Sequence, residues 1–283
     1  MTPALLDASA LRARLNEPGL VLLDARFELG DPDAGGAAWR AACIPGAHFV
    51  DLDTVLSDHT KPASEGRHPL PDIGTFRAQL GRFGIGPQSR VVVYDAGSSA
   101  MAAARAWWLL RLAGVPQTQV LDGGFAAWRA AGGESAQGVD AQAAEPLDAN
   151  WPQLPQRVVD AQAVRGRGAS ATLVDARAPE RFRGEVEPLD PRAGHIPGAV
   201  SRPFAENLDA GRFKSPERLR DEWQALLNGR APEDAIVYCG SGVTACHHAL
   251  ALAHAGLAAP RVFAASWSGW TSDPAAAAVA VGA

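Results

Sequence analysis

The sequence of 283 residues has few cysteines, no long apolar run and no excess of basic residues. Its three cysteines, Cys43, Cys239 and Cys246, form no CxxC pair, which argues against a disulfide framework and against a zinc site. No run of about 18 apolar residues is present, so no transmembrane helix is expected. The net charge of -5 argues against nucleic acid as a partner, because phosphate binding needs a basic face. We therefore expect no metal, no cofactor, no nucleic acid and no membrane among its partners.

The composition is that of a soluble protein with a substantial core, since 47% of the residues are hydrophobic and 20% are charged. The opening stretch, MTPALLDASALRARLNEPG, has the pattern of a short amphipathic helix. It contains acidic residues and lacks an apolar segment followed by a cleavage site, so no signal peptide is expected. A reducing cytoplasm is the expected location.

An internal repeat is the most informative feature of the sequence. Four motifs recur in the same order, and the offset drifts only from 151 (Asp24 to Asp175) to 142 (Trp128 to Trp270). The pairs are LVLLDAR with ATLVDAR, CIPGAHFVDLD with HIPGAVSRPFA, RVVVYDAGSSA with AIVYCGSGVTA, and VLDGGFAAW with VFAASWSGW. A period this long indicates two tandem domains and excludes a solenoid of short units.

Within each half, short runs rich in valine and leucine alternate with helical stretches, which predicts an α/β fold with a mainly parallel sheet flanked by helices. Helices are expected over 76–84, 101–114, 217–229 and 244–256, each closed by a glycine. Residues 131–156 are rich in glycine, proline and small polar residues. We therefore expect domains at 1–135 and 158–283, joined by a linker at 136–157. The alanine-rich end, 274–283, is expected to be a loosely held tail.

Cys239 ends the apolar run AIVY and is followed by GSGV and a helix predicted from about Thr244. At that place loop N–H groups and a helix N-terminus converge, which favours a thiolate and a bound anion. Gly240 and Gly242 permit the unusual backbone angles that such a loop needs. The alternative is an inert buried cysteine. The duplication favours the functional interpretation, because the first copy carries Asp95 at the position of Cys239.

The motifs CGSGVTAC, DAR, HIPGA and SWSGW, in this arrangement over almost the whole chain, resemble the tandem rhodanese-type sulfurtransferases. The resemblance implies two rhodanese-like domains, of which the N-terminal one is the inactive copy. It also implies that Cys239 is the nucleophile, taking the outer sulfur of a donor as a persulfide. A second nucleophile, such as cyanide, a small thiol or a thioredoxin-like protein, would then collect this sulfur in a ping-pong reaction.

The choice of donor depends on the residues after the cysteine. Thiosulfate-type members of the family carry basic residues there, whereas Gly240 and Ser241 are neutral, so the loop resembles the 3-mercaptopyruvate type. The Ser241 hydroxyl is expected to hydrogen-bond the leaving group or to activate Cys239, and the substrate-binding loop is Gly240, Gly242, Val243 and Thr244. A thiosulfate:cyanide sulfurtransferase and a persulfide carrier for a protein partner are the alternatives.

The carboxylate of mercaptopyruvate needs a cation. Arg181, in ERFRGE, matches a substrate-binding arginine of the family, and a guanidinium fork suits a planar carboxylate. The alternative for Arg181 is an ordinary surface arginine. Arg192 is the nearest candidate for a second family arginine, although EVEPLDPRAGHIPG does not align cleanly with the family pattern.

Asp53 and His68 match an aspartate and a histidine that face the cysteine in mercaptopyruvate-type members. A histidine there would assist proton transfer, and the alternative is a pair of polar loop residues with a packing role. At Gly269 the chain departs from the family, which has an acidic residue between the two tryptophans.

Asp24 with Arg26, and Asp175 with Arg177, are expected to form structural ion pairs, because both copies of the repeat carry them. Cys43 and Cys246 are interpreted as structural, with a resolving-thiol role for Cys246 as the weaker alternative. A cysteine phosphatase is disfavoured, since Ala245 stands at the position of the arginine that would clamp phosphate. A monomer is the simplest expectation for a tandem chain.

Overall fold

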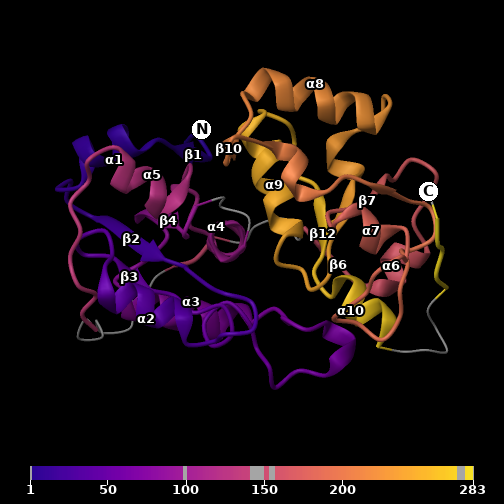
Figure 1. Ribbon diagram of the computed structural model, residues 1–283, viewed down its shortest axis with the longest axis horizontal. Coiled ribbons are helices and arrows are strands. Elements are labelled where there is room, and N and C mark those ends of the chain that lie inside the picture. Colours follow the sequence, from indigo (N-terminus) through magenta and orange to yellow (C-terminus); the bar gives the residue numbers. More distant parts are fainter. Residues whose placement is uncertain (1, 98–100, 141–149, 153–156, 273–277, 283) are drawn as a thin grey trace. The chain divides into compact units, whose positions relative to one another are not determined.

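The computed structural model describes residues 2–97, 101–140, 150–152, 157–272 and 278–282 (Figure 1). Its contacts divide the chain into two units. The first comprises residues 1–58, 71–156 and 210–212, and the second comprises 59–70, 157–209 and 213–283. The units are therefore not continuous in sequence, because residues 59–70 from the first half of the chain pack with the second unit.

The first unit contains a sheet in the order β1-β5-β4-β2-β3, in which every pair of neighbours is parallel. Valine and leucine side chains fill both faces of its central strands, as expected for a parallel sheet covered on both sides. The strands are β1 (Leu5–Leu6), β2 (Leu20–Asp24), β3 (His48–Phe49), β4 (Arg90–Tyr94) and β5 (Thr118–Leu121).

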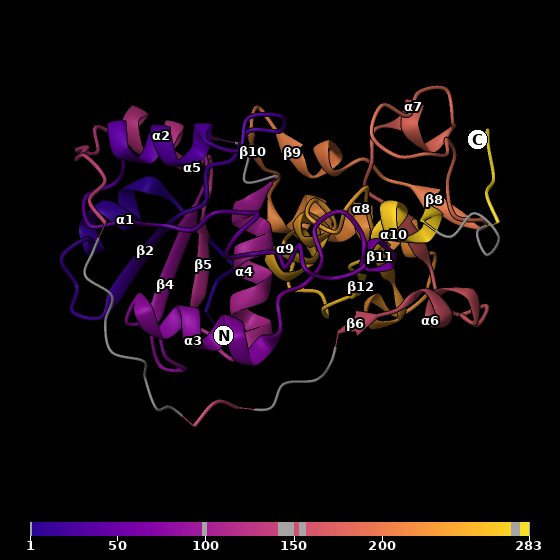
Figure 2. The same ribbon diagram turned by 90° about the horizontal axis from the view of Figure 1, so that it is seen from below.

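Helices cover both faces of this sheet (Figure 2). On one face Leu11, Trp39 and Trp128 pack against alternate strand residues, and these side chains come from α1 (Ala8–Arg14), α2 (Ala34–Ala41) and α5 (Gly124–Ala130). The other face is covered by α4 (Ala102–Ala113), which also contacts α3 (Ile73–Arg82).

The second unit repeats this topology, with the order β6-β12-β11-β7-β8 and parallel pairing throughout. Its strands are β6 (Val158–Val159), β7 (Leu173–Asp175), β8 (Ala199–Ser201), β11 (Ile236–Tyr238) and β12 (Arg261–Phe263). The short strands β9 (Leu208–Asp209) and β10 (Arg212–Phe213) pair separately.

The helices of the second unit also form two layers. Val164, Trp267 and Trp270 pack on one face of the sheet, from α6 (Ala161–Arg165) and α10 (Ser266–Thr271). The helices α8 (Pro216–Leu227) and α9 (Ala245–His254) contact each other, and α9 also packs on β11 and β12. The remaining helical segments are η1 (Ala63–Glu65), α7 (Pro179–Phe182), η2 (Phe204–Asn207) and η3 (Pro232–Asp234).

Equivalent hydrogen bonds occur at corresponding positions of the two units. Ile44 N–H donates to the Tyr94 hydroxyl at 3.1 Å, and Ile196 N–H donates to the Tyr238 hydroxyl at 3.2 Å. Cys43 pairs with Ala136 in the first unit as His195 pairs with Ala280 in the second. The predicted α/β repeat of two sheet domains is thus confirmed.

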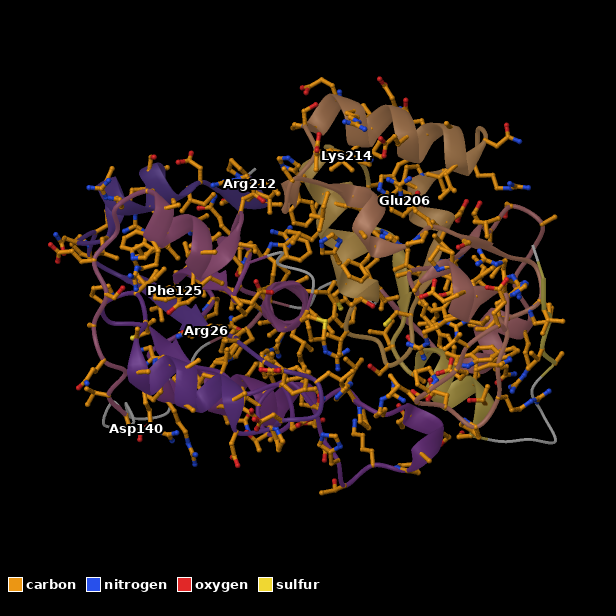
Figure 3. All side chains as sticks on the ribbon, viewed as in Figure 1. Arg26, Phe125, Asp140, Glu206, Arg212 and Lys214 are labelled. Carbon is orange, nitrogen blue, oxygen red and sulfur yellow. The ribbon has the colours of Figure 1, made fainter. Side chains whose placement is uncertain are left out.

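The predicted ion pairs are also present. Arg26 binds Asp24 at 2.6 Å and its guanidinium lies 4.7 Å from the centre of the Phe125 ring (Figure 3). Arg177 binds Asp175 at 2.7 Å and lies 4.5 Å from the Trp267 ring. Burial lowers the pKa of Arg177, but the hydrogen bonds to Asp175 and the charges of Asp175, Tyr238 and Glu187 together raise it above its ordinary value, so this cation stays charged inside the unit.

Several local expectations were wrong. The opening stretch is not one helix, because Leu5–Leu6 forms β1 and pairs with β5 before α1 begins. The left-handed residue that ends α8 is Asn228, one position before the expected glycine, whereas Gly114 ends α4 as predicted. The last residues are not all loosely held, since Ala280 pairs with His195, while residues 273–277 lie outside the described part of the chain.

Most of the predicted linker lies outside the described residues as well, but its first part packs with the first unit: Ala136 bonds Cys43, and Gly138 lies against Trp39. Of the described helices, none has both the length and the apolar character to cross a membrane.

Candidate active site

Cys239 lies directly after β11, the central strand of the second sheet. Ligands of open parallel sheets bind at the carboxyl ends of the strands, which is where this residue stands. Its side chain is buried, with 1% of the residue exposed. The loop that follows leads through Thr244, the residue before α9, into that helix.

Backbone hydrogen bonds fix the cysteine and its loop. Gly242 N–H donates to the Cys239 sulfur at 3.1 Å, and Cys239 N–H donates to the Ser266 hydroxyl at 3.1 Å. The carbonyls of Cys239 and Gly240 accept from the first residues of α10, at 3.0 and 2.9 Å. The N–H dipole at the sulfur stabilises negative charge, which is what a nucleophilic thiolate requires.

Gly242 cannot carry a side chain. Its φ is +79°, and a Cβ there would lie 2.1 Å from the carbonyl oxygen of Ala264. The neighbouring Val243 is buried and its carbonyl accepts from Cys246 N–H at 3.1 Å. The loop residues expected from the sequence, Gly240 to Thr244, are thus placed together around the cysteine.

A histidine from the first half of the chain reaches this loop. His68 Nδ1 lies 2.8 Å from the Ser241 hydroxyl, although the two residues are 173 positions apart. Both side chains are buried. The arrangement joins two of the residues predicted from the sequence in one hydrogen bond, which can carry a proton between hydroxyl and imidazole.

Residues 59–70, which include His68, pack against α10. Arg67 N–H donates to the Ser268 hydroxyl at 2.9 Å. A Cβ at Gly269 would lie 2.7 Å from the carbonyl oxygen of Ser64 and 3.1 Å from Gly66 N. An acidic side chain at Gly269, as in the family pattern, has no room here, which explains that departure.

Arg181 lies in α7 and is held by carboxylates. It binds Glu187 through Nε (3.2 Å) and Nη2 (2.6 Å), and Asp190 through Nη2 (3.2 Å). A Cβ at Gly240 would lie 3.3 Å from Arg181 Nη1, so the guanidinium adjoins the loop that begins at Cys239. The structure therefore brings Arg181 to the cysteine loop.

Sequence analysis missed the groups that hold this arginine. The side chains of Glu187 and Asp190 are buried, and Arg67 binds Asp190 at 2.6 Å. Burial raises the pKa of Asp190 above its ordinary value, against the opposing effect of Arg67. The available signals were the carboxylates in GEVEPLD and the cation beside His68 in GRHPLP.

Two further predicted residues, Arg192 and Asp53, are described by other contacts. Arg192 accepts a hydrogen bond from Trp267 Nε1 (2.9 Å) through its carbonyl oxygen, which anchors the chain before His195. Asp53 belongs to the first unit, where its N–H donates to Asp51 and its side chain lines a pocket with Arg40.

The two other cysteines are buried. Burial, and then the charge of Asp24, raise the pKa of Cys43, which disfavours a thiolate there. The Cys246 thiol donates to the Gly242 carbonyl at 3.4 Å and so contacts the loop from the first turn of α9.

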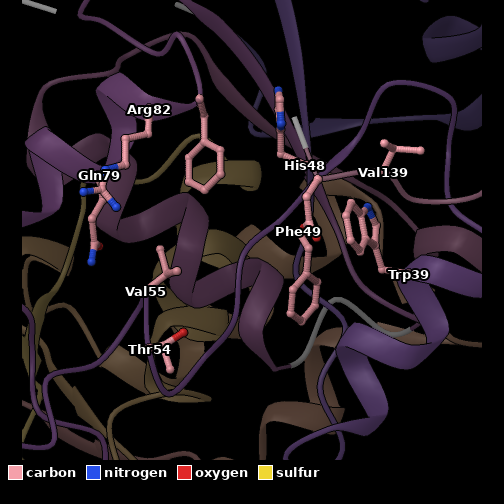
Figure 4. Close-up of a pocket in the computed structure, with 10 residues that line it drawn as sticks. Trp39, His48, Phe49, Thr54, Val55, Gln79, Arg82 and Val139 are labelled. Atoms are coloured by element: carbon pink, nitrogen blue, oxygen red, sulfur yellow. The ribbon is translucent and has the colours of Figure 1, made fainter. Parts of the chain in front are cut away.

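A pocket of about 380 Å³ lies in the first unit (Figure 4). Aromatic and polar side chains line it, among them Trp39, His48, Phe49 and Arg82, and no cysteine is in its lining. It therefore offers no group for sulfur chemistry. Within the described ranges, no three His, Cys, Asp or Glu side chains are grouped so as to hold a metal ion.

The chain is similar to known proteins over most of its length. The family model of the rhodanese-like domain matches residues 7–131 and 159–273. The chain is 48% identical to a probable 3-mercaptopyruvate sulfurtransferase of Pseudomonas aeruginosa, over 95% of both chains. It is 43% identical to a putative thiosulfate sulfurtransferase, SseB, of Mycobacterium tuberculosis, over 89% of this chain and 88% of the relative.

Among solved structures, the 3-mercaptopyruvate sulfurtransferase SseA of Escherichia coli is similar with a TM-score of 0.79 and 33% identity. The similarity covers 94% of this chain and 99% of that one.

Proposed function

Because the chain belongs to the rhodanese-like family, we propose that it is a sulfurtransferase that moves sulfur from 3-mercaptopyruvate to a thiol or to cyanide. The observation that carries this proposal is the cysteine loop. The Cys239 sulfur accepts a backbone N–H, and the buried Ser241–His68 pair and the Arg181 guanidinium adjoin the same loop.

In the first half-reaction the Cys239 thiolate attacks the sulfur of mercaptopyruvate. A sulfur–sulfur bond forms, the carbon–sulfur bond breaks, and its electron pair leaves as the enolate of pyruvate. The proton that the donor thiol loses ends on that carbon, and the Ser241–His68 hydrogen bond provides a route for it. Cys239 is left as a persulfide.

In the second half-reaction an acceptor attacks the outer sulfur of the persulfide and releases the Cys239 thiolate. Cyanide would leave as thiocyanate, and a thiol would leave as a persulfide of its own. We propose a small thiol or a thioredoxin-like protein as the acceptor, acting on a monomer in a reducing cytoplasm. Three cysteines that form no disulfide suit such a location.

Mercaptopyruvate is favoured as donor because Gly240 and Ser241 bring no charge to the loop, and a nearby arginine suits a carboxylate. The names of the Pseudomonas and Escherichia relatives support this choice. Thiosulfate is the second candidate, since the Mycobacterium relative bears that donor in its name. A persulfide carrier for a protein partner is the third.

The test compares kcat/KM for mercaptopyruvate and for thiosulfate on the purified protein, with cyanide as acceptor. We expect mercaptopyruvate to react faster, and mass spectrometry after donor alone should find one added sulfur atom on Cys239. Faster turnover of thiosulfate would overturn the choice of donor. A persulfide that forms but passes its sulfur only to a protein would favour the carrier.

A further inference from the structure

Two guanidinium groups face the cysteine loop, and sequence analysis identified only one of them. A Cβ at Gly240 would lie 3.3 Å from Arg181 Nη1 and 3.4 Å from Arg67 Nη2. Gly240 is the residue directly after Cys239. Any oxygen that approaches this glycine beside the sulfur therefore meets a donor from each arginine.

Buried carboxylates bind both arginines through nitrogen atoms other than the two that lie nearest to Gly240. Asp190 bridges them, accepting from Arg67 Nη1 at 2.6 Å and from Arg181 Nη2 at 3.2 Å. Glu187 takes Nε and Nη2 of Arg181. The nitrogen atoms nearest to Gly240, Arg181 Nη1 and Arg67 Nη2, donate to no other group in the part of the chain that the structure describes.

Arg67 has a second unused donor. Its Nε is buried and has no hydrogen-bond partner among the described residues. Nε and Nη2 form the edge with which a guanidinium grips a carboxylate in a fork. Asp190 occupies Nη1 only, so this edge is left for a ligand.

The charges of the ion-pair network beside the loop balance. Three arginines are connected by ion pairs to three buried carboxylates: Arg67, Arg177 and Arg181 with Asp175, Glu187 and Asp190. A connected set without net charge accepts a monoanion more readily than a dianion. The carboxylate of an α-keto acid is such a monoanion.

We propose that Arg67 is the second carboxylate-binding arginine of this site, gripping the donor together with Arg181 in the role that the sequence suggested for Arg192. The proposal rests on the proposed transfer from an α-keto acid donor. Arg67 supplies a fixed guanidinium, because Asp190 and the bond from its N–H to Ser268 set its position. The same chain segment thus brings both Arg67 and His68 to the loop.

The test measures by calorimetry how tightly pyruvate binds. Pyruvate is the product that remains when mercaptopyruvate has lost its sulfur. The proteins compared are the unaltered protein, Arg67→Ala, Arg67→Lys and Arg192→Ala. We expect Arg67→Ala to weaken binding about tenfold, which corresponds to about 1.4 kcal/mol. Arg67→Lys should recover part of this, since it keeps the charge and loses the fork. Arg192→Ala, the matched control, should change it less than about twofold.

A second measurement separates carboxylate binding from damage to the loop. Mercaptoacetone has the sulfur and the ketone of mercaptopyruvate without the carboxylate, so Arg67→Ala should raise KM for mercaptopyruvate and should lower kcat/KM for mercaptopyruvate much more than kcat/KM for mercaptoacetone. The double variant Arg67→Ala, Asp190→Asn keeps the network neutral and should bind pyruvate as weakly as Arg67→Ala does.

Unchanged pyruvate affinity in Arg67→Ala, no pyruvate binding by the unaltered protein, or an equal loss with mercaptoacetone would each overturn the proposal. Pyruvate binding is independent of turnover. A protein that binds pyruvate through Arg67 but forms no persulfide with mercaptopyruvate would instead refute the proposed function.

Discussion

The two residues directly after β4 and the two directly after β11 make the same backbone hydrogen bonds but carry different side chains. After β4, the carbonyls of Asp95 and Ala96 accept from the N–H groups of Phe125 and Ala126, at 2.8 and 3.0 Å. After β11, the carbonyls of Cys239 and Gly240 accept from the corresponding residues of α10. This backbone arrangement is thus a property of the fold and does not depend on the thiol.

The side chains make the difference. Asp95 Oδ1 accepts from Gly97 N–H at 3.2 Å, whereas the Cys239 sulfur accepts from Gly242 N–H. Gly124 has a φ of +56° in the first copy, and Ser266 has a φ of +55° in the second. The second copy tolerates a strained serine whose hydroxyl holds the Cys239 N–H. The first copy keeps this backbone arrangement without a thiol, whereas the proposed sulfur transfer requires the thiol and the groups that hold it.

The largest effect is expected from making the second loop resemble the first. Cys239→Asp and Cys239→Ser should each lower sulfur transfer by more than about a thousandfold, because the nucleophile is lost. Cys43→Ser and Cys246→Ser should keep most of the activity in the same assay. An active Cys239→Ser protein together with an inactive Cys43→Ser protein would reverse the assignment of the nucleophile.

The next effect concerns the backbone of the reactive loop. Gly242→Ala should destabilise the protein by about 3 kcal/mol or more, because the new Cβ meets the Ala264 carbonyl at a positive φ. Gly19→Ala is the matched control: φ is +75° there, but nothing lies within 4 Å, so a cost of about 1 kcal/mol is expected. Urea unfolding measures both. Equal costs would show that the contact with Ala264 is relieved by a small backbone movement.

Replacing Ser266 tests the strained position directly. Ser266→Gly and Ser266→Ala both remove the acceptor for Cys239 N–H, and each should lower kcat/KM about tenfold. Glycine adopts a φ of +55° without strain, so Ser266→Ala should be less stable than Ser266→Gly by about 1 kcal/mol in urea unfolding. If the alanine variant proved the more stable of the two, strain at this residue would be ruled out.

The smallest expected effect is on how the free energy of unfolding of the second unit changes with pH. Burial raises the pKa of Glu222, but Lys214 and Arg202 lower it more, to about 2. The carboxylate therefore stabilises the second unit above its ordinary pKa of 4.5, and this contribution is lost as pH falls toward 2. In Glu222→Gln the loss of unfolding free energy on acidification should be smaller by about 1 kcal/mol, a value reduced for solvent screening.

The measurement is urea unfolding between neutral pH and pH 2, with Gln224→Ala on the same helix as control. A Glu222→Gln protein that loses stability in acid as steeply as the unaltered protein would contradict this prediction.

The sequence was sufficient for the repeat and for the position of the cysteine loop between a strand and a helix, since both depend on local patterns. Buried valine runs, the glycines of CGSGV and the position of Cys239 after a strand all lie within short segments. The strand Leu5–Leu6 was missed, because two residues beside an amphipathic pattern carry no signal, and its pairing with β5 is made by distant backbone groups.

The surroundings of the loop could not be predicted in full, because they depend on contacts between distant segments. Arg67 meets Asp190 across 123 positions and Ser268 across 201 positions. Resemblance pointed to His68, Arg181 and Arg192, but it gave no sign of Arg67; the carbonyl of Arg192 accepts from Trp267 Nε1. The buried carboxylates Glu187 and Asp190 appear in the sequence only as ordinary acidic residues of a polar stretch.

The grouping of residues 59–70 with the second unit has a consequence for modularity. A gene cut at residue 157 would encode two products that each contain a complete five-stranded sheet. The C-terminal product would keep Cys239, yet Arg67 and His68 would be encoded by the other piece. The boundary between the sheets therefore differs from the boundary of the candidate site. A cut at residue 157 leaves each sheet complete but divides the residues of the candidate site between two products.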